Sequence, residues 1–66
     1  MEIVNHVHHY RKQANLTQEK LAQLAHVSRK TINSLERGHY TPSLLLALQI
    51  SKILNLDINV IFSIKE

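Results

Sequence analysis

The strongest constraint on the fold of this chain lies in residues 16–38, which read LTQEKLAQLAHVSRKTINSLERG. Thr17 and Ser28 are each typical of a helix N-cap, and Gly38 is placed to stop the second helix in the left-handed conformation. Leu21, Leu24 and Ala25 recur at helical spacing. The residues expected on the buried side of the pair are Leu21, Ala25, Val27, Ile32 and Leu35. The stretch therefore predicts two short helices joined by a tight turn and held against an apolar core.

Helix signals continue on both sides of this pair. Asn5 can cap a first helix that runs to about Ala14. The Thr41-Pro42 step predicts a fourth, leucine-rich helix with proline at its first position. Asp57 can cap a last helical turn. Together these signals predict an all-α domain built from five helices.

The C-terminal tail supports two interpretations. Four apolar residues alternate as in a strand, Ile58, Val60, Phe62 and Ile64, whereas Ile58, Ile61 and Phe62 have helical spacing. We expect one helical turn to about Ile61, followed by a short strand over residues 62–64. The other β-prone piece is Ile3-Val4, so the two ends of the chain are expected to pair as a two-stranded sheet. The alternative is that both ends are simply apolar caps on the core.

Composition limits the class of protein. Residues 1–66 suffice for one domain, and a chain of this length buries only roughly 60% of its unfolded surface. The chain has no cysteine and is 44% hydrophobic, so its stability must come from a dense helical core, from dimerisation or from both. The sequence contains no signal segment and no apolar run of ~18 residues. We therefore expect a soluble, cytoplasmic protein without a membrane partner.

Positive charge is concentrated in one part of the chain. The formal net charge is +3, and six of the eight basic residues fall within residues 11–37, against only Glu19 and Glu36. One positive region on a small domain is typical of a nucleic-acid-binding protein, although basic faces also occur as ordinary solvated surface. Charge alone thus favours nucleic acid as the partner and leaves the plainer alternative open.

The order of these residues resembles the Cro/CI-type helix-turn-helix family, also called the XRE family, across residues 11–62. The shared positions are Arg11, Leu16, Thr17, Gln18, Leu21, Ala22, Val27, Ser28, Arg29, Thr31, Ile32, Leu35, Glu36, Arg37, Gly38, Pro42 and Ser43, followed by the leucine-rich helix. The resemblance implies a compact Cro/CI-like domain with its helix-turn-helix at residues 17–37. It also implies a transcriptional regulator that binds double-stranded DNA.

In that family the helix matching residues 28–37 enters the major groove. Base contacts come from its first turn and from one turn later, which match Arg29, Lys30, Asn33 and Ser34. Phosphate contacts are expected near helix N-termini and in the following loop, at Thr17, Gln18, Ser28, Thr31, Arg37, His39 and Tyr40. For Lys30 and Ser34, a phosphate contact or no contact is the alternative.

Three positions are expected to support the DNA-facing helix. Arg11 and Glu36 resemble the family's internal ion pair, for which separate surface roles are the alternative. Ala22 lies where the two helices cross, and a larger side chain there would cost ~1–3 kcal/mol. His26 stands where the family usually has glycine, at a position that needs positive φ. We expect His26 to carry local backbone strain and no chemistry.

One reading helix covers about half a turn of DNA, so we expect a homodimer on a pseudo-palindromic operator, acting as a repressor at the nucleoid. The predicted dimerisation region is residues 55–66, whose apolar residues exceed what the core of one small domain needs: Leu56, Ile58, Val60, Ile61, Phe62 and Ile64. The alternative is a protein-interaction module, such as the antitoxin of a toxin–antitoxin pair, with DNA binding secondary. No extended toxin-wrapping segment is visible, which argues against it. A regulatory protein partner remains open.

Enzymatic and metal-binding functions find little support. There is no glycine-rich phosphate loop, cysteine nucleophile or close pair of carboxylates. We therefore expect that the protein is not an enzyme and that it binds no cofactor or small-molecule ligand. His6, His8 and His9 cluster on the first helix, but no cysteine or carboxylate lies nearby in sequence to complete a metal site. An exposed polar face is the expected role of these histidines.

His39 leads to a testable expectation. Protonation of its imidazole in mild acid would add positive charge to the phosphate-contacting loop. Affinity for DNA is therefore expected to be higher at about pH 5.5 than at about pH 8, and His39→Gln should reduce the difference. Binding titrations at constant ionic strength measure this effect. Equal affinity at the two pH values would contradict it.

Overall fold

The computed structural model describes all 66 residues and contains the predicted helix pair. Helix α2 spans Gln18–Ala25 and helix α3 spans Arg29–Glu36. The Thr17 hydroxyl caps α2 by accepting a 3.0 Å hydrogen bond from the backbone N–H of Lys20. The Ser28 hydroxyl caps α3 in the same way, at 3.1 Å from the N–H of Thr31. Both predicted N-caps are confirmed.

The turn between α2 and α3 passes through the left-handed region. His26 has φ 59° and ψ 39°, as expected for a position where glycine is favoured. Gly38, just beyond α3, has φ 78° and ends that helix as predicted. The other non-glycine residues with positive φ are Asn15 and Asn55, and asparagine tolerates this region better than most residues.

Helix α4 spans Leu44–Leu54 and begins two residues later than predicted. Its N-cap is Ser43, whose hydroxyl accepts a 3.1 Å hydrogen bond from the N–H of Leu46. Pro42 therefore lies before the cap, and the prediction that it occupies the first helical position is wrong. The reason is local: a serine hydroxyl can satisfy a free N–H of the first turn, so the cap falls one residue after the proline.

Helix α1 spans Val7–Gln13, and its N-cap is His6, which makes no side-chain capping bond. The prediction that Asn5 is the cap is therefore wrong, because pairing with the C-terminal strand draws Asn5 into a strand. Its side chain still supports the junction. The Asn5 Oδ1 atom accepts from the N–H of Val7 at 3.2 Å, and Nδ2 donates to the carbonyl of Leu35 at 2.9 Å.

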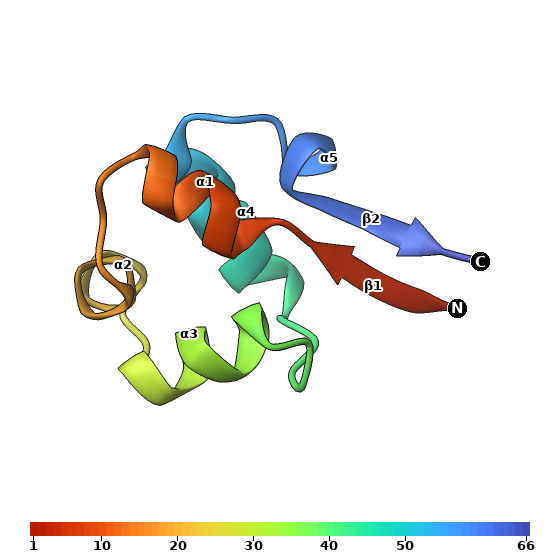
Figure 1. Cartoon of the computed structure of the whole chain (residues 1–66), viewed down its shortest axis with the longest axis horizontal. Helices are drawn as coiled ribbons and strands as arrows, with labels where there is room; N and C mark the ends of the chain where they lie inside the picture. The colour runs from red at the N-terminus through yellow and green to blue at the C-terminus, as the bar shows by residue number, and fades with distance from the viewer.

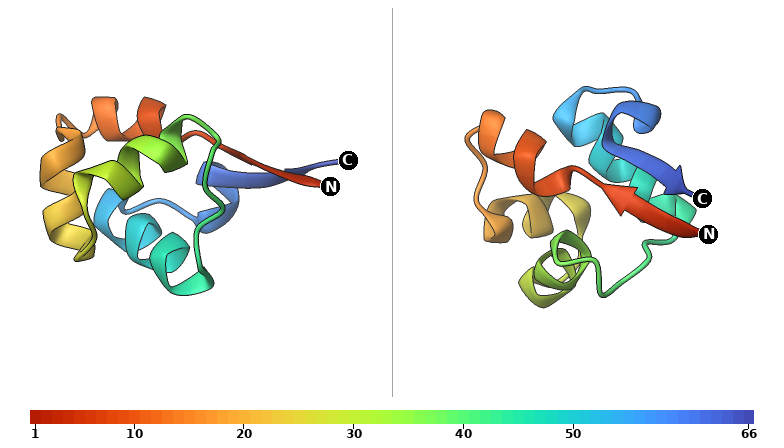
Figure 2. Two further views of the ribbon diagram at one scale, coloured as in Figure 1. Left: turned by 90° about the horizontal axis from the view of Figure 1, so that it is seen from below. Right: turned by 45° about the vertical axis from the view of Figure 1, so that its right-hand side comes forward.

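The two ends of the chain pair as predicted. Strand β1 (Glu2–Asn5) and strand β2 (Phe62–Lys65) form an antiparallel two-stranded sheet in which Ile3 faces Ile64. Helix α5 (Ile58–Ile61) precedes β2 and is capped by Asp57, also as predicted. Figure 1 shows the pair of strands leaving the helices as a ribbon, with both termini at its far end. In the two further views in Figure 2 the strand pair again protrudes from the helices.

A single apolar core joins all five helices. It consists of Val7, Leu21, Ala22, Ala25, Ile32, Leu35, Leu46, Ala47, Ile50, Ile61 and Phe62. Leu24 has helical spacing with Leu21 and Ala25, but it is 43% exposed and is turned toward solvent. None of the helices is long and apolar enough to cross a membrane.

The left-handed turn yields a stability prediction. His26→Gly should stabilise the fold, because glycine removes the Cβ strain at φ 59°. The gain should be at most about 1 kcal/mol, since glycine also loses more backbone entropy on folding. Asn15→Gly is the matched control at φ 58°, and its effect should be smaller because asparagine already tolerates the region. Thermal unfolding measures both variants. A clear fall in melting temperature for His26→Gly would contradict the claim that His26 carries backbone strain.

Candidate nucleic-acid interface

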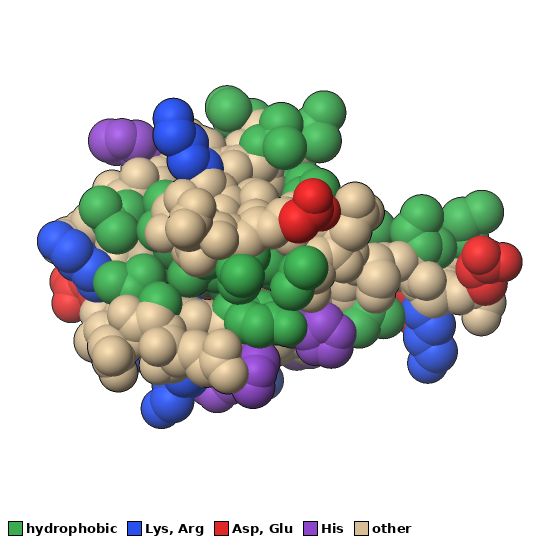
Figure 3. Space-filling view, turned by 90° about the horizontal axis from the view of Figure 1, so that it is seen from above, with side chains coloured by type: hydrophobic (Ala, Val, Ile, Leu, Met, Phe, Trp, Pro, Cys, Tyr) green, Lys and Arg blue, Asp and Glu red, His purple; other side chains and the backbone are tan.

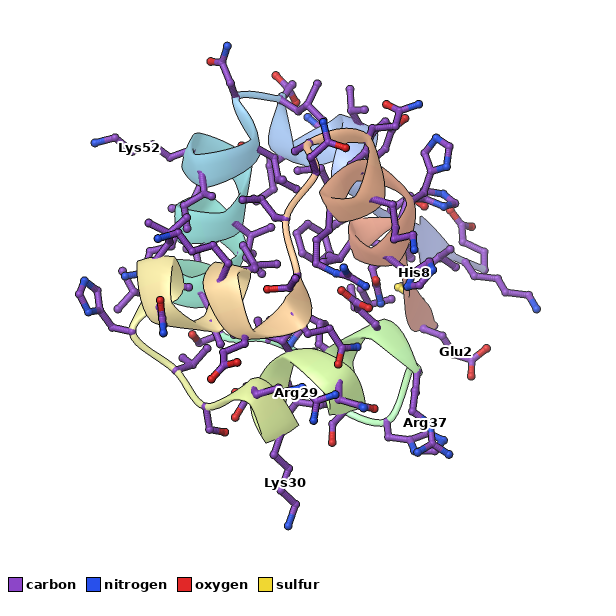
Figure 4. All side chains as sticks on the ribbon, turned by 60° about the vertical axis from the view of Figure 1, so that its left-hand side comes forward. Glu2, His8, Arg29, Lys30, Arg37 and Lys52 are labelled. Atoms are coloured by element: carbon purple, nitrogen blue, oxygen red, sulfur yellow. The ribbon has the colours of Figure 1, made fainter.

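Helix α3 has one fully buried side and one polar side. Ile32 and Leu35 are completely buried, and this anchors the helix against the core. On the other side, the exposed or half-buried residues line a shallow surface depression that contains no hydrophobic residue: Arg29, Lys30, Asn33, Ser34 and Arg37. Figure 4 shows Lys30 and Arg37 pointing away from the body of the molecule, with Arg29 beside them on α3. The arrangement presents cationic and amide donors on a helix face that solvent can reach.

The residues predicted to contact phosphate lie around this helix in two groups. The hydroxyls of Thr17 and Ser28 serve as helix caps, and the Ser28 hydroxyl also lies 3.0 Å from that of Thr31. His39 and Tyr40 lie exposed in the loop between α3 and α4. These positions flank α3, so a duplex placed against its polar side would have polar groups on both sides of the groove.

An ion pair holds α3 against α1. The Nε atom of Arg11 lies 2.6 Å from Oε2 of Glu36, and its Nη2 donates to Oε1 at 3.1 Å. The side chains are 7% and 3% exposed, so the pair is shielded from water. The Nη1 atom of Arg11 also donates to the carbonyl of Leu16 at 2.7 Å. One guanidinium therefore ties together α1, the segment leading to α2, and the end of α3.

Two further side chains reach the same carboxylate. The Nε2 atom of Gln18 donates to Oε1 of Glu36 at 3.1 Å, and Nδ1 of His8 lies 3.1 Å from the same oxygen. Sequence reasoning missed this role of both residues. The only sequence signal was the spacing of His8 three residues before Arg11, which places the two on one face of a helix.

These contacts determine the titration of Glu36. Burial raises the pKa of its carboxyl, but the hydrogen bonds from Arg11, Gln18 and His8, with the positive charge of Arg11, outweigh burial and lower the pKa below its ordinary value. The carboxylate is thus ionised throughout the neutral range. A charge at this position keeps the α1–α3 connection in place.

The histidines do not form a metal site with other ligands. Across the chain, no group of three or more histidine or acidic side chains lies close enough together to hold a metal ion. His8 instead contacts Glu36 and also lies 3.2 Å from Nη2 of Arg11.

The apolar C-terminal residues divide between core and surface. Ile61 is completely buried in the domain's own core, so the prediction that it belongs to a dimer surface is wrong. Phe62 is 9% exposed and packs in the same core. Leu56 and Ile58 are half-buried and pack against that core. Only Val60 and Ile64 of this set are well exposed.

Comparisons with known proteins agree with this geometry. Residues 7–61 match a family model described as helix-turn-helix. The chain is 48% identical over 58 residues to an uncharacterized HTH-type transcriptional regulator of Methanocaldococcus jannaschii, with 88% of each chain covered. It is 39% identical over 62 residues to the uncharacterized HTH-type transcriptional regulator YgzD of Bacillus subtilis, with 94% of each covered.

Solved structures show the same fold. The restriction-modification controller protein C.AhdI from Aeromonas hydrophila matches with a TM-score of 0.76 and 28% identity over 80% of each chain. The clp gene regulator ClgR from Corynebacterium glutamicum matches with a TM-score of 0.78 and 24% identity, over 82% of this chain and 57% of that one. The fold and the polar side of α3 thus define a helix-turn-helix DNA-binding regulator. Within that class the chain belongs to the Cro/CI-type (XRE) family, which is not a family of enzymes.

The ion pair predicts a specific pH dependence of stability. The pKa of Glu36 is lower in the folded protein than its ordinary value of 4.5. The ionised carboxylate therefore contributes its full stabilisation at pH values above 4.5, and this contribution is lost as the pH falls through the folded-state pKa. Glu36→Gln should cost about 3 kcal/mol near neutral pH, since it leaves the Arg11 charge shielded and unpaired. The cost should shrink in acid.

Urea unfolding at several pH values measures this difference. Glu2→Gln is the control, because that carboxyl is exposed at the start of β1 and should leave the pH profile nearly unchanged. A Glu36→Gln variant as stable as the wild type at neutral pH would show that the pair contributes no net stability.

Proposed function

We propose that this regulator is a repressor that binds a pseudo-palindromic operator as a homodimer, with α3 of each copy in the major groove. The observation that carries the proposal is the polar side of α3, where Arg29, Lys30, Asn33 and Ser34 lie together opposite the buried Ile32 and Leu35. A helix anchored on one side and polar on the other can approach base edges without disturbing the core.

The side chains on this helix suit direct readout of bases. Arg29 can donate two hydrogen bonds to a guanine, and Asn33 can both donate to and accept from an adenine. Each such contact is worth ~1–3 kcal/mol of discrimination. The contacts of Glu36 with Arg11 and Gln18 hold the end of α3, which supports readout by side chains presented in a fixed position. Lys30 and Ser34 extend the same face.

The phosphate contacts complete the proposed interface. They are assigned to the N-terminal ends of α2 and α3 and to the loop after α3: Thr17, Gln18, Ser28, Thr31, Arg37, His39 and Tyr40. Such contacts set the position of the protein on the duplex and make the affinity depend on salt. Gln18 already donates to Glu36, so it would reach a phosphate through its backbone N–H.

Dimerisation is proposed on geometric grounds. One copy of α3 reads about half a helical turn, whereas two copies related by a two-fold axis and separated by ~34 Å read an inverted repeat. A bound dimer would repress by occupying DNA that RNA polymerase needs. This function places the protein in the cytoplasm, at the nucleoid.

Selection from random DNA duplexes tests the proposal. The wild type should enrich an inverted repeat with half-sites about one helical turn apart, bound ~10³-fold or more tightly than random DNA. Arg29→Ala should weaken operator binding by roughly 10-fold or more and relax the preference at one symmetric base position. Lys52→Ala is the control, because it removes an equal charge from α4, outside the polar side of α3.

The salt dependence separates the outcomes. A selected operator should stay preferred as salt rises, although affinity for all DNA falls. Recovery of no motif, with binding that disappears as salt rises, would contradict sequence-specific readout. The protein-interaction module would then be the better interpretation.

A further inference from the structure

An apolar groove lies outside the core, between the β-ribbon and the start of α4. It has a volume of about 280 Å³ and is lined by residues from five parts of the chain: Ile3, Thr41, Pro42, Leu44, Ala47, Ile58 and Phe62. Leu44 stands in its wall with 71% of its surface exposed. Leu45 and Leu48 continue the exposed apolar surface along α4, at 68% and 50%. Figure 3 shows hydrophobic side chains along an edge of the body and on the projecting ribbon.

We infer that this groove is the two-fold interface at which a second copy of the chain docks, with Leu44 of each copy packing against the groove of the other. The inference rests on the homodimer proposed above and names the surface that forms it. It shares Ile58 and Phe62 with the region predicted from sequence, residues 55–66, and adds Ile3, Pro42 and Leu44 from outside that region.

Charge favours a second copy as the occupant. None of the residues that line the groove carries an ionisable side chain, whereas the depression on α3 is lined by three basic residues and no hydrophobic one. Each copy has a net charge of +3, and two copies that meet at an uncharged groove bring no like charges together at the contact. An isologous interface must also be complementary to itself, and an uncharged groove with an exposed leucine in its wall meets that condition.

The position of the groove leaves the DNA-facing helix free. No residue lines both the groove and the α3 depression. In Figure 1 the ribbon lies at one end of the long axis, while α3 lies along the lower side of the body. Docking at the groove therefore leaves the polar side of α3 uncovered in each copy.

The dimensions of the domain set the scale for a dimer. The Cα extents are 31 × 22 × 19 Å. The ~34 Å required between the two α3 helices on successive half-sites is therefore comparable with the long dimension of one copy.

The area required is also modest. A standard interface buries about 800 Å² on each partner, roughly a sixth of the 4690 Å² accessible surface of this chain. The apolar surface available to this interface is the groove together with the exposed leucines of α4 and Ile64 of the ribbon. Burial there would also support the ribbon, since two-stranded sheets are marginal on their own.

Sedimentation equilibrium of four full-length proteins tests the inference, with circular dichroism to verify folding. Wild type should be a dimer, and Leu44→Glu should raise the dimer dissociation constant by at least about 30-fold while keeping the helical spectrum. Leu24→Glu is the matched control, because it places the same charge on an exposed leucine of α2 outside the groove, and it should remain a dimer. Val60→Glu tests the exposed side of α5 and should also remain a dimer.

A dimeric Leu44→Glu protein would overturn the groove as the interface and leave the homodimer standing. Dissociation of Val60→Glu in place of Leu44→Glu would move the interface to α5. A wild type that is monomeric at every concentration, both free and on its selected operator, would overturn the homodimer and this inference together.

Cross-linking gives a second measurement that does not depend on a destabilising charge. The chain has no cysteine, so Thr41→Cys introduces a single thiol at the groove. A short bismaleimide linker should join two Thr41→Cys copies efficiently, and Lys20→Cys copies, with the thiol on α2, poorly. Equal cross-linking of the two variants would contradict the assigned interface.

Discussion

The contact between Arg11 and Glu36 is the interaction on which the rest of the structure depends. Its two bonds, at 2.6 and 3.1 Å, connect α1 to the end of α3. The same carboxylate accepts from Gln18, and the same guanidinium donates to the carbonyl of Leu16. Three helices and one connecting segment thus share a single charged cluster, which is shielded from water and therefore costly to break at one partner.

This cluster and the apolar core together position α3. Ile32 and Leu35 set its depth against the core, and Glu36 sets the orientation of its C-terminal end. The polar side chains of α3 stay at the surface, where the proposed DNA contacts would be made. In a chain of 66 residues, with no disulfide and a core of 11 residues, a second copy would add the apolar burial that one copy lacks.

The sequence was most informative where structure is decided locally. The caps at Thr17 and Ser28 and the left-handed turn at His26 each depend on a few neighbouring residues, and their patterns predicted them. Helix α4 begins after the Ser43 cap and not at Pro42, because neighbouring residues offered two different helix starts. Residues that depend on distant partners were harder to place. Asn5 is held in β1 by strand pairing, and Phe62 packs in the core. The contact of His8 with Glu36 spans 28 positions.

The central claim is that α3 reads DNA sequence, and the most direct test maps the contact residue by residue. Backbone amide shifts should be recorded by NMR on titration with the selected operator and with a scrambled duplex of the same length. The account predicts that operator-specific changes concentrate in residues 28–37, with smaller changes common to both duplexes at the start of α2 and in the loop after α3. Equal changes with both duplexes, or operator-specific changes centred on the ribbon, would contradict it.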